Sequence, residues 1–330
     1  MDLVIRNGII VDGNGGPAFV GDVGIKDGLI ARIGDLGDVV ADEEIDATGR
    51  HVMPGWTDVH THYDAQCMWD PLLSPSGPAG VTTVITGNCG VGCAPTRATE
   101  ADREFMIGML GAIEDIPAEV LRQGTKWHVD GGKDWESFPE YLDALDKLHF
   151  AVDIACLVPH ACVRPYVLGP ERADELDRPG APLTNPLTDE EKEAIAECVR
   201  EAVHAGAIGF STNRFRDHRD ARGVLAPGTL ASADEVVMCA KACAEAGAKM
   251  FDMHSDFVGY DDVAPHKMDP DLRKEHYDRE WAWIHFIAKE YGLTVQWLGN
   301  ASLEELDKGE SSSRPARRLC ILWCLLLRLL

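Results

Sequence analysis

The chain has 330 residues, of which 45% are hydrophobic, so it can bury a sizeable core and form a large catalytic domain with a small accessory one. It carries 31 basic and 55 acidic residues, a net charge of −24. Such a surface repels phosphate backbones and anionic membranes, so neither nucleic acid nor a membrane is expected as a partner.

Residues 1–53 alternate apolar positions with turn pairs. The stretches "DLVIRNGIIVDGNG" and "DVGIKDGLIARIGD" contain Asn-Gly and Asp-Gly pairs, which are typical of tight hairpins. We therefore expect a small antiparallel β unit in this part of the chain.

From residue 54 to about residue 310 short apolar runs alternate with helical patterns. Thr188 with Glu191, and Ser232 with Glu235, have the spacing of helix capping boxes. This alternation predicts a parallel α/β fold, either a barrel or an open sheet, interrupted by a long polar segment at 97–148. The six candidate strands are 55–60, 80–86, 150–158, 207–212, 248–254 and 293–299.

The last segment, residues 311–330, changes composition to "SSSRPARRLCILWCLLLRLL". Its apolar run contains Arg328 and is shorter than the roughly 20 residues that a membrane-spanning helix needs. We expect no further barrel strand here and interpret the segment as a frameshifted or truncated end, with a membrane-surface helix as the alternative.

The ten cysteines are spread along the chain without a dense disulfide framework. The opening "MDLVIRNGIIVDG" indicates a strand and a turn rather than a secretory signal. Both features predict a reducing cytoplasm as the location, with most cysteines buried as small apolar side chains.

Two histidines follow the first candidate strand in "PGWTDVHTHYDAQ". Side chains on a strand alternate between faces, so His60 and His62 point the same way. At the carboxyl end of a barrel strand both would face the active-site rim, where two imidazoles form half of a tetrahedral metal site. Asp58 and Asp64 flank the pair and are candidates to orient the rings.

Other chemically active side chains follow later strands. Cys89 lies in "TGNCGVGCAP", where a thiolate could bind zinc or act as a nucleophile. His160 and Arg164 follow the third candidate strand, and His254 ends the fifth. Histidine or cysteine therefore recurs at strand ends, which is the pattern expected of a metal-bearing barrel.

These motifs resemble a known family. "IDATGRHVMPGWTDVHTHYDAQ", "GVTTVITGNCGVGCAP" and "GAIGFST" are similar to the amidohydrolase superfamily, in its D-aminoacylase (N-acyl-D-amino-acid deacylase) branch. The resemblance implies a metal-dependent (β/α)8 TIM-type barrel, incomplete here, with a small N-terminal β-sandwich domain. It also implies a zinc-dependent hydrolase of the linear amide C–N bond in an N-acyl amino acid.

Site residues carry over by motif. The resemblance implies one or two Zn²⁺ per chain, with His60, His62, Cys89 and His254 as ligands. His160 and Arg164 would line the substrate pocket. The substrate carboxylate needs a cation, for which Arg164, Arg214 and Arg216 are candidates because a guanidinium can clamp a carboxylate with two hydrogen bonds.

The sequence departs from the family at several places, which include the sixth strand and the last barrel strand. The sixth strand should end in a second ligating histidine and a lysine, whereas "TVQWLGN" contains neither. The aspartate that serves as general base is expected beyond the chain end, so the chain is expected to be a poor enzyme.

Alternatives remain open at this point. One is a cyclic-amide hydrolase related to dihydropyrimidinase, against which Cys89 argues, since those enzymes carry a carboxylated lysine there. Another is a non-catalytic truncated fragment, and a third is a hydrolase with a cysteine nucleophile and no metal. An oligomer is compatible with the sequence.

Overall fold

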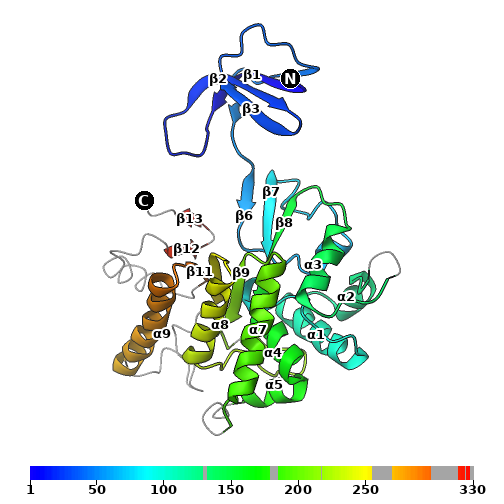
Figure 1. Cartoon of the computed structure of the whole chain (residues 1–330), viewed down its shortest axis with the longest axis vertical. Coiled ribbons are helices and arrows are strands. Elements are labelled where there is room, and N and C mark those ends of the chain that lie inside the picture. Colours follow the sequence, from blue (N-terminus) through cyan, green and yellow to red (C-terminus); the bar gives the residue numbers. More distant parts are fainter. Residues whose placement is uncertain are drawn as a thin grey trace. The chain divides into compact units, whose positions relative to one another are not determined.

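A computed structural model describes residues 1–128, 132–178, 185–216, 218–254, 270–298, 319–323 and 325–327. The chain divides into two compact units, Met1–Trp56 and Thr57–Leu330, which are drawn in sequence colours in Figure 1. No helix among the described residues is both long enough and apolar enough to cross a membrane.

The first unit is a five-stranded sheet with strand order β3-β2-β1-β4, in which β5 also pairs with β1. Asp27 and Gly28 both have positive φ, 53° and 74°, which confirms the Asp-Gly hairpin between β2 and β3. The strands are β1 (Leu3–Ile10), β2 (Phe19–Lys26), β3 (Leu29–Gly34), β4 (Glu43–Asp46) and β5 (His51–Val52).

The expectation of a purely antiparallel unit is wrong, because β4 and β5 run parallel to β1. Strand β2 runs antiparallel to β1, and β3 runs antiparallel to β2, so β3 has the same direction as β1. Residues 35–42 then lead to the other side of β1, and β4 enters in that same direction. These strands form one sheet, and the second layer of a β-sandwich stays a prediction.

The second unit contains an eight-stranded sheet whose strands β6 to β13 are neighbours in chain order. Among the described residues, each strand from β7 to β12 pairs with the next one in parallel. The six strands expected from the sequence are present, which confirms the parallel α/β fold. The strands are β6 (Trp56–Asp58), β7 (Val81–Thr86), β8 (Asp153–Pro159), β9 (Gly209–Asn213), β10 (Met250–His254), β11 (Thr294–Leu298), β12 (Leu319–Trp323) and β13 (Leu325–Leu327).

The prediction that no strand follows β11 is wrong. Strand β12 pairs parallel to β11, and β13 pairs antiparallel to β12. Runs of Leu, Ile, Cys and Trp suit a strand buried in a sheet as well as a short helix, so the composition alone did not discriminate between the two.

Helices connect the parallel strands, and Figure 1 shows α7, α8 and α9 beside β8 to β11. Buried apolar side chains such as Ile195 and Val199 on α7 and Val236 on α8 are completely covered. Burial of one such side chain stabilises the fold by roughly 1.5–3 kcal/mol. The helices are α1 (Glu100–Ile113), α2 (Ala118–Gly124), α3 (Phe138–Asp146), α4 (His160–Leu168), α5 (Pro170–Leu176), α7 (Asp189–Ala205), α8 (Ala233–Glu245) and α9 (Pro270–Glu290), with short 3-10 turns η1 (Gln66–Met68) and η2 (Asn88–Gly90).

One of the two predicted capping boxes is complete. At α7 the Thr188 side chain accepts from the Glu191 amide, and the Glu191 carboxylate accepts from the Thr188 amide. At α8 the Ser232 hydroxyl accepts from the Glu235 amide, but the Glu235 carboxylate points elsewhere, into a buried ion pair. The capping pattern therefore predicted the start of α8 and missed the second role of Glu235.

The parallel sheet curls, because side chains from its later strands reach the loops that follow its first strands. Gln296 of β11 donates to the carbonyl of Val59, directly after β6, at 3.0 Å. Asp252 of β10 accepts from the backbone amide of Cys89, in the turn η2 that follows β7, at 2.8 Å. The carboxyl ends of four strands therefore face one shared space, and the candidate site lies there.

Candidate metal centre

Three metal-binding side chains converge at the ends of β6 and β7. One ligand atom from each of His60, His62 and Cys89 lies within 4.8 Å of the others. The Nε2 atom of His60 is 3.2 Å from the Cys89 sulfur, and the two imidazoles pack edge to face with centroids 5.3 Å apart. The H-x-H spacing and the cysteine after the next strand thus produce a three-donor cluster.

The backbone of η2 holds Cys89 in this cluster. Gly87, Cys89 and Gly90 all have positive φ, at 79°, 53° and 68°. The Gly90 amide donates to the Ser211 hydroxyl at 3.2 Å, and the Asn88 amide group donates to the Ile85 carbonyl at 2.8 Å. A left-handed backbone at a non-glycine residue is costly, and such strain is typical of functional sites.

Gly87 allows β8 to pass close to this turn. A Cβ atom at Gly87 would lie 2.3 Å from the Leu157 carbonyl oxygen, whereas one at Gly223, which also has positive φ, would meet nothing within 4 Å. We expect Gly87→Ala to cost about 1–3 kcal/mol more in unfolding free energy than Gly223→Ala. Urea unfolding of both variants measures this difference, and equal costs would contradict the close approach.

The second nitrogen of His60 faces two further side chains. Its Nδ1 atom is 3.1 Å from Gln296 Nε2 and 3.8 Å from Asp252 Oδ1. Gln296 also lies 3.3 Å from the Asn88 side-chain oxygen. These contacts fix the plane of the His60 ring, so that Nε2 points toward Cys89.

His62 contacts Glu114, which is not among the site residues expected from the sequence. The His62 Nδ1 and Glu114 Oε1 atoms are 3.0 Å apart, and both are buried. Burial, then the charges of His60 and His218, lower the pKa of His62 to about 3. Burial, then Asp64, raises the pKa of Glu114 to about 8. At neutral pH His62 therefore keeps a lone pair for a cation. No local motif marks Glu114, which follows α1 in the polar segment.

The Cys89 thiol lies in an environment that opposes ionisation. Burial, followed by the charges of Asp252, Glu114 and Asp64, raises the pKa of Cys89 well above its ordinary value. A free sulfur here stays protonated and is a poor nucleophile, whereas a coordinated thiol loses its proton. This environment argues against the metal-free cysteine hydrolase.

His254 lies close to the cluster but outside its 4.8 Å group. Its side chain is 4% exposed, and its ring stacks on Phe215 with centroids 4.3 Å apart. Burial, then the charges of His218, His60 and His62, lower the pKa of His254 to about 3. The structure therefore gathers three of the four expected ligands and places the fourth beside them.

His160 and Arg164 lie in a buried ion-pair network. The His160 ring contacts Thr212 Oγ1 at 2.9 Å and Glu235 Oε1 at 3.1 Å. The Arg164 guanidinium, 1% exposed, donates to both Glu235 oxygens, at 2.9 and 3.1 Å, and to Asp177. Asp177 also accepts the backbone amides of Gly228 and Leu230, so the network ties α4, α5 and α8 to the loop before α8.

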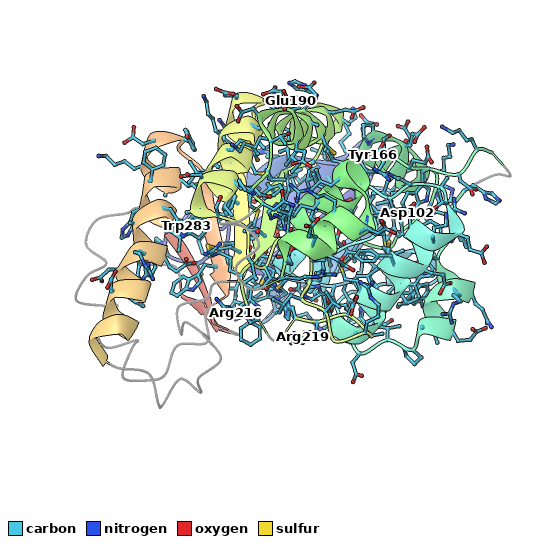
Figure 2. All side chains as sticks on the ribbon, turned by 90° about the horizontal axis from the view of Figure 1, so that it is seen from below. Asp102, Tyr166, Glu190, Arg216, Arg219 and Trp283 are labelled. Atoms are coloured by element: carbon cyan, nitrogen blue, oxygen red, sulfur yellow. The ribbon has the colours of Figure 1, made fainter. Side chains whose placement is uncertain are left out.

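The other two expected cations lie on the loop after β9. Arg214 makes a bidentate pair with Glu280 of α9, with both distances 2.9 Å, and its guanidinium lies 5.9 Å from the Trp283 ring centroid. Arg216 is half-buried, and Figure 2 labels it on the same side of the view as Arg219, away from Glu190 of α7. The guanidinium of Arg214 is therefore already engaged by a carboxylate.

The network predicts an acid dependence of stability. Burial raises the pKa of Glu235, but Arg164 and His160 outweigh it and lower the pKa to about 2. An unfolded glutamate titrates near about 4.3, so the folded carboxylate stabilises above that pH and loses its contribution as the pH falls toward about 2. We expect a loss of about 3 kcal/mol over this window.

The comparison of wild type with Glu235→Gln by urea unfolding checks this dependence. The stability gap between them should be largest above about pH 5 and should shrink toward about pH 2. A gap that stays constant over that range would contradict the low pKa of Glu235.

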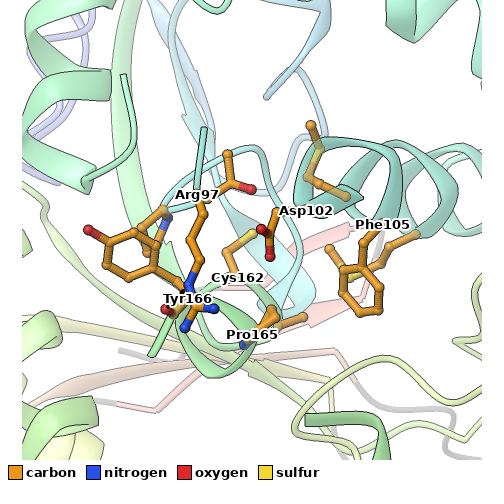
Figure 3. Close-up of a pocket in the computed structure, with 11 residues that line it drawn as sticks. Arg97, Asp102, Phe105, Cys162, Pro165 and Tyr166 are labelled. Carbon is orange, nitrogen blue, oxygen red and sulfur yellow. Dashed lines mark hydrogen bonds between the residues drawn. The ribbon is translucent and has the colours of Figure 1, made fainter. Parts of the chain in front are cut away.

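A separate hollow lies between α1 and α4 and shares no residue with the cluster (Figure 3). Phe105 and Met109 of α1 and Pro165 of α4 line it, while Arg97 donates to the carbonyl of Tyr166 at 2.9 Å. Its free volume of about 10 Å³ holds about one water molecule. The hollow is therefore too small to bind a substrate.

Comparisons with known proteins agree with this fold and with the resemblance seen in the sequence. A D-aminoacylase from Alcaligenes xylosoxydans xylosoxydans is 35% identical over 214 residues, which are 65% of this chain and 38% of that protein. An N-acyl-D-aspartate deacylase from the same organism is 32% identical over 248 residues, 75% of this chain and 42% of that protein. The chain thus spans about two fifths of these relatives.

A solved structure has a similar fold. The N-acyl-D-glutamate deacylase of Bordetella bronchiseptica, crystallised with zinc and a phosphonate inhibitor, has a TM-score of 0.66 and 25% identity. The match covers 97% of this chain and 57% of that one. A model of the amidohydrolase family matches residues 43–318, which confirms the resemblance seen in the sequence. The chain belongs to the amidohydrolase family, in its D-aminoacylase branch.

Proposed function

We propose that this chain is a zinc-dependent hydrolase unit that acts on the linear amide C–N bond of N-acyl-D-amino acids. The observation that carries the proposal is the convergence of His60, His62 and Cys89 within 4.8 Å at the carboxyl ends of β6 and β7. The parallel sheet is then part of a (β/α)8 barrel, whose active sites lie at that rim. The similarity to three deacylases supports the substrate class.

The donor set fits zinc. Burial keeps the His62 imidazole neutral with a lone pair, and the His60 imidazole supplies a second nitrogen. A thiol that resists ionisation without a cation supplies the third ligand. Bound zinc would supply a Lewis acid that polarises the scissile carbonyl and lowers the pKa of water. His60, His62 and Cys89 would hold it, with His254 close by as the fourth expected ligand.

The chain's own residues would position the metal and the substrate. Asp252 and Gln296 orient His60, as described above. Arg216 remains our candidate for the substrate carboxylate, because its loop also carries Phe215 and His218, which contact His254. His160 and Arg164, being buried, would support the loop that follows β9 rather than touch substrate directly.

A reducing location is part of the proposal. Eight cysteines of the described chain are free and buried, a usage typical of a cytoplasmic protein. The net charge of −24 argues against a nucleic acid partner. The similarity to deacylases supports a small N-acyl amino acid as the partner.

The test is hydrolysis of N-acetyl-D-methionine by the purified full chain with added zinc. We expect release of D-methionine that depends on the added zinc, because bound zinc would polarise the scissile carbonyl. The release should stop in Cys89→Ala and should not occur with the L enantiomer. Turnover that survives chelation would contradict the proposal, and zinc binding without turnover would favour the non-catalytic alternative.

A further inference from the structure

Each imidazole of the three-donor cluster has one nitrogen that faces a side chain from a distant segment. For His60 this side chain is Gln296, whose Nε2 atom lies 3.1 Å from Nδ1. For His62 it is Glu114, whose Oε1 atom lies 3.0 Å from Nδ1. A histidine that binds a metal usually donates its other ring N–H to such a partner, which fixes the plane and the tautomer of the ring. Glu114 therefore occupies the position of a residue that orients a ligand.

The two aspartates beside the histidines in the sequence do not take this position. Asp58 accepts a hydrogen bond from the Ser76 hydroxyl at 2.9 Å. Among the described residues, neither Asp58 nor Asp64 forms an ion pair with His60 or His62. The carboxyl group that faces His62 therefore comes from another segment of the chain.

The end of α1 holds Glu114 in place. The Glu114 amide donates to the Leu110 carbonyl at 2.8 Å, and Asp115, with a φ of 55°, then turns the chain. A Cβ atom at Gly111 would lie 2.9 Å from the Ile116 carbonyl oxygen, so this glycine allows the chain to return close to the helix. Leu110 is 3% exposed and belongs to the hydrophobic core. Glu114 is therefore positioned by a helix that packs on the core.

The backbone next to His62 is fixed as well. The amide and the hydroxyl of Thr61 both donate to the Ile85 carbonyl of β7, at 3.2 and 2.6 Å. The Thr61 carbonyl accepts from the Asn88 side chain at 3.1 Å. Both partners of the contact between His62 and Glu114 are therefore held by ordered backbone.

The two facing atoms, His62 Nδ1 and Glu114 Oε1, are buried. Within the described ranges neither forms an aligned hydrogen bond, although they lie at hydrogen-bond distance from each other. A buried polar atom without a partner is costly, and the terminal torsion of a glutamate is broad, so a rotation of the carboxyl group can align the pair. A carboxyl group can accept a hydrogen bond whether or not it is ionised, so the interaction does not depend on the charge of Glu114.

We propose that Glu114 is a positioning residue of the metal centre, which accepts the Nδ1–H of His62 and leaves Nε2 with the lone pair that a cation needs. The polar segment at 97–148, which carries Glu114, then contributes to the site although it interrupts the alternation of strands and helices. This inference rests on the metal centre of the proposed function.

Competition of the full chain with a zinc-binding dye tests the proposal. Glu114→Leu removes the acceptor and should lower zinc affinity by about 10–100-fold. Glu114→Gln keeps a carbonyl oxygen and should retain most of the affinity. The matched control is Asp174→Leu, which should keep the wild-type affinity. The Asp174 side chain on α5 is 14% exposed, against 12% for Glu114, and it pairs with Arg222 outside the cluster.

Nitrogen-15 NMR of the zinc-loaded chain with labelled histidine gives a readout that a loss of packing alone would not change. In the wild type, Nδ1 of His62 should carry a proton that exchanges slowly with water. In Glu114→Leu this proton should exchange faster, because its acceptor is gone. The absence of the signal in His62→Asn assigns it to His62.

The outcomes separate this inference from the proposed function. Wild-type zinc affinity in Glu114→Leu would overturn the role of Glu114 while leaving the metal centre intact. A loss in Glu114→Gln as large as that in Glu114→Leu would also overturn it, because acceptance of the hydrogen bond would not be the cause. Absence of zinc binding by the wild type would overturn the metal centre and the inference with it. Circular dichroism of each variant verifies that it is folded.

Discussion

Arg164→Ala should lower the unfolding free energy by about 3–5 kcal/mol, the range expected when one partner of a buried ion pair is removed. The substitution leaves the carboxylates of Glu235 and Asp177 without their shared guanidinium, and both are nearly inaccessible to water. Burial already raises the pKa of Asp177 despite Arg164, so loss of the guanidinium would raise it further. Urea unfolding of the full chain measures the loss.

The matched control is Arg122→Ala. Arg122 makes an equivalent bidentate pair with Glu104, at 2.8 Å for both contacts, but on the surface. Exposed pairs contribute little because water screens them, so this variant should unfold at nearly the wild-type urea concentration. Equal effects of the two substitutions would show that Arg164 is not part of a buried network. They would also restore it as a candidate for binding substrate.

Cys89→Ala should reduce zinc affinity by more than about 100-fold, since even loss of a residue that only orients a ligand costs about 10–100-fold. The sulfur is the single anionic ligand that the three-donor cluster can offer, and its replacement leaves two neutral imidazoles. Competition with a zinc-binding dye, using the full chain, measures the dissociation constant.

Cys198→Ala controls for general effects of removing a buried thiol. Cys198 is a free, 9% exposed cysteine on α7, and it belongs to the hydrophobic core rather than to the cluster. Its substitution should leave zinc affinity unchanged. If both cysteine variants keep wild-type affinity, the metal centre does not include Cys89.

Most of the fold could be predicted from local sequence patterns, namely apolar runs and helix caps. The apolar runs located all six expected strands, and the Thr188 and Ser232 caps marked the starts of α7 and α8. These features depend on neighbouring residues, which a sequence displays directly. The direction of β4 and the pairing of β12 depend on how distant segments cross, so the local pattern did not reveal them.

In the candidate site, too, local patterns were predictable from the sequence and contacts between distant segments were not. His60 and His62 were predictable because strand alternation puts them on one face, and the resemblance identified Cys89. Glu114 and His218 were missed, since each reaches the site from a loop or a helix end far along the chain. Arg164 was predicted to bind substrate. Its ion-pair partners Glu235 and Asp177 lie elsewhere in the sequence, so the local pattern around Arg164 does not show that its guanidinium is already paired.

The most direct test of the metal centre is an anomalous-scattering map of the full chain crystallised with zinc. A peak within coordination distance of His60, His62 and Cys89, at about 2.0–2.3 Å from their nitrogen and sulfur atoms, is the predicted result. A zinc-loaded crystal with no anomalous peak among these three side chains would contradict it.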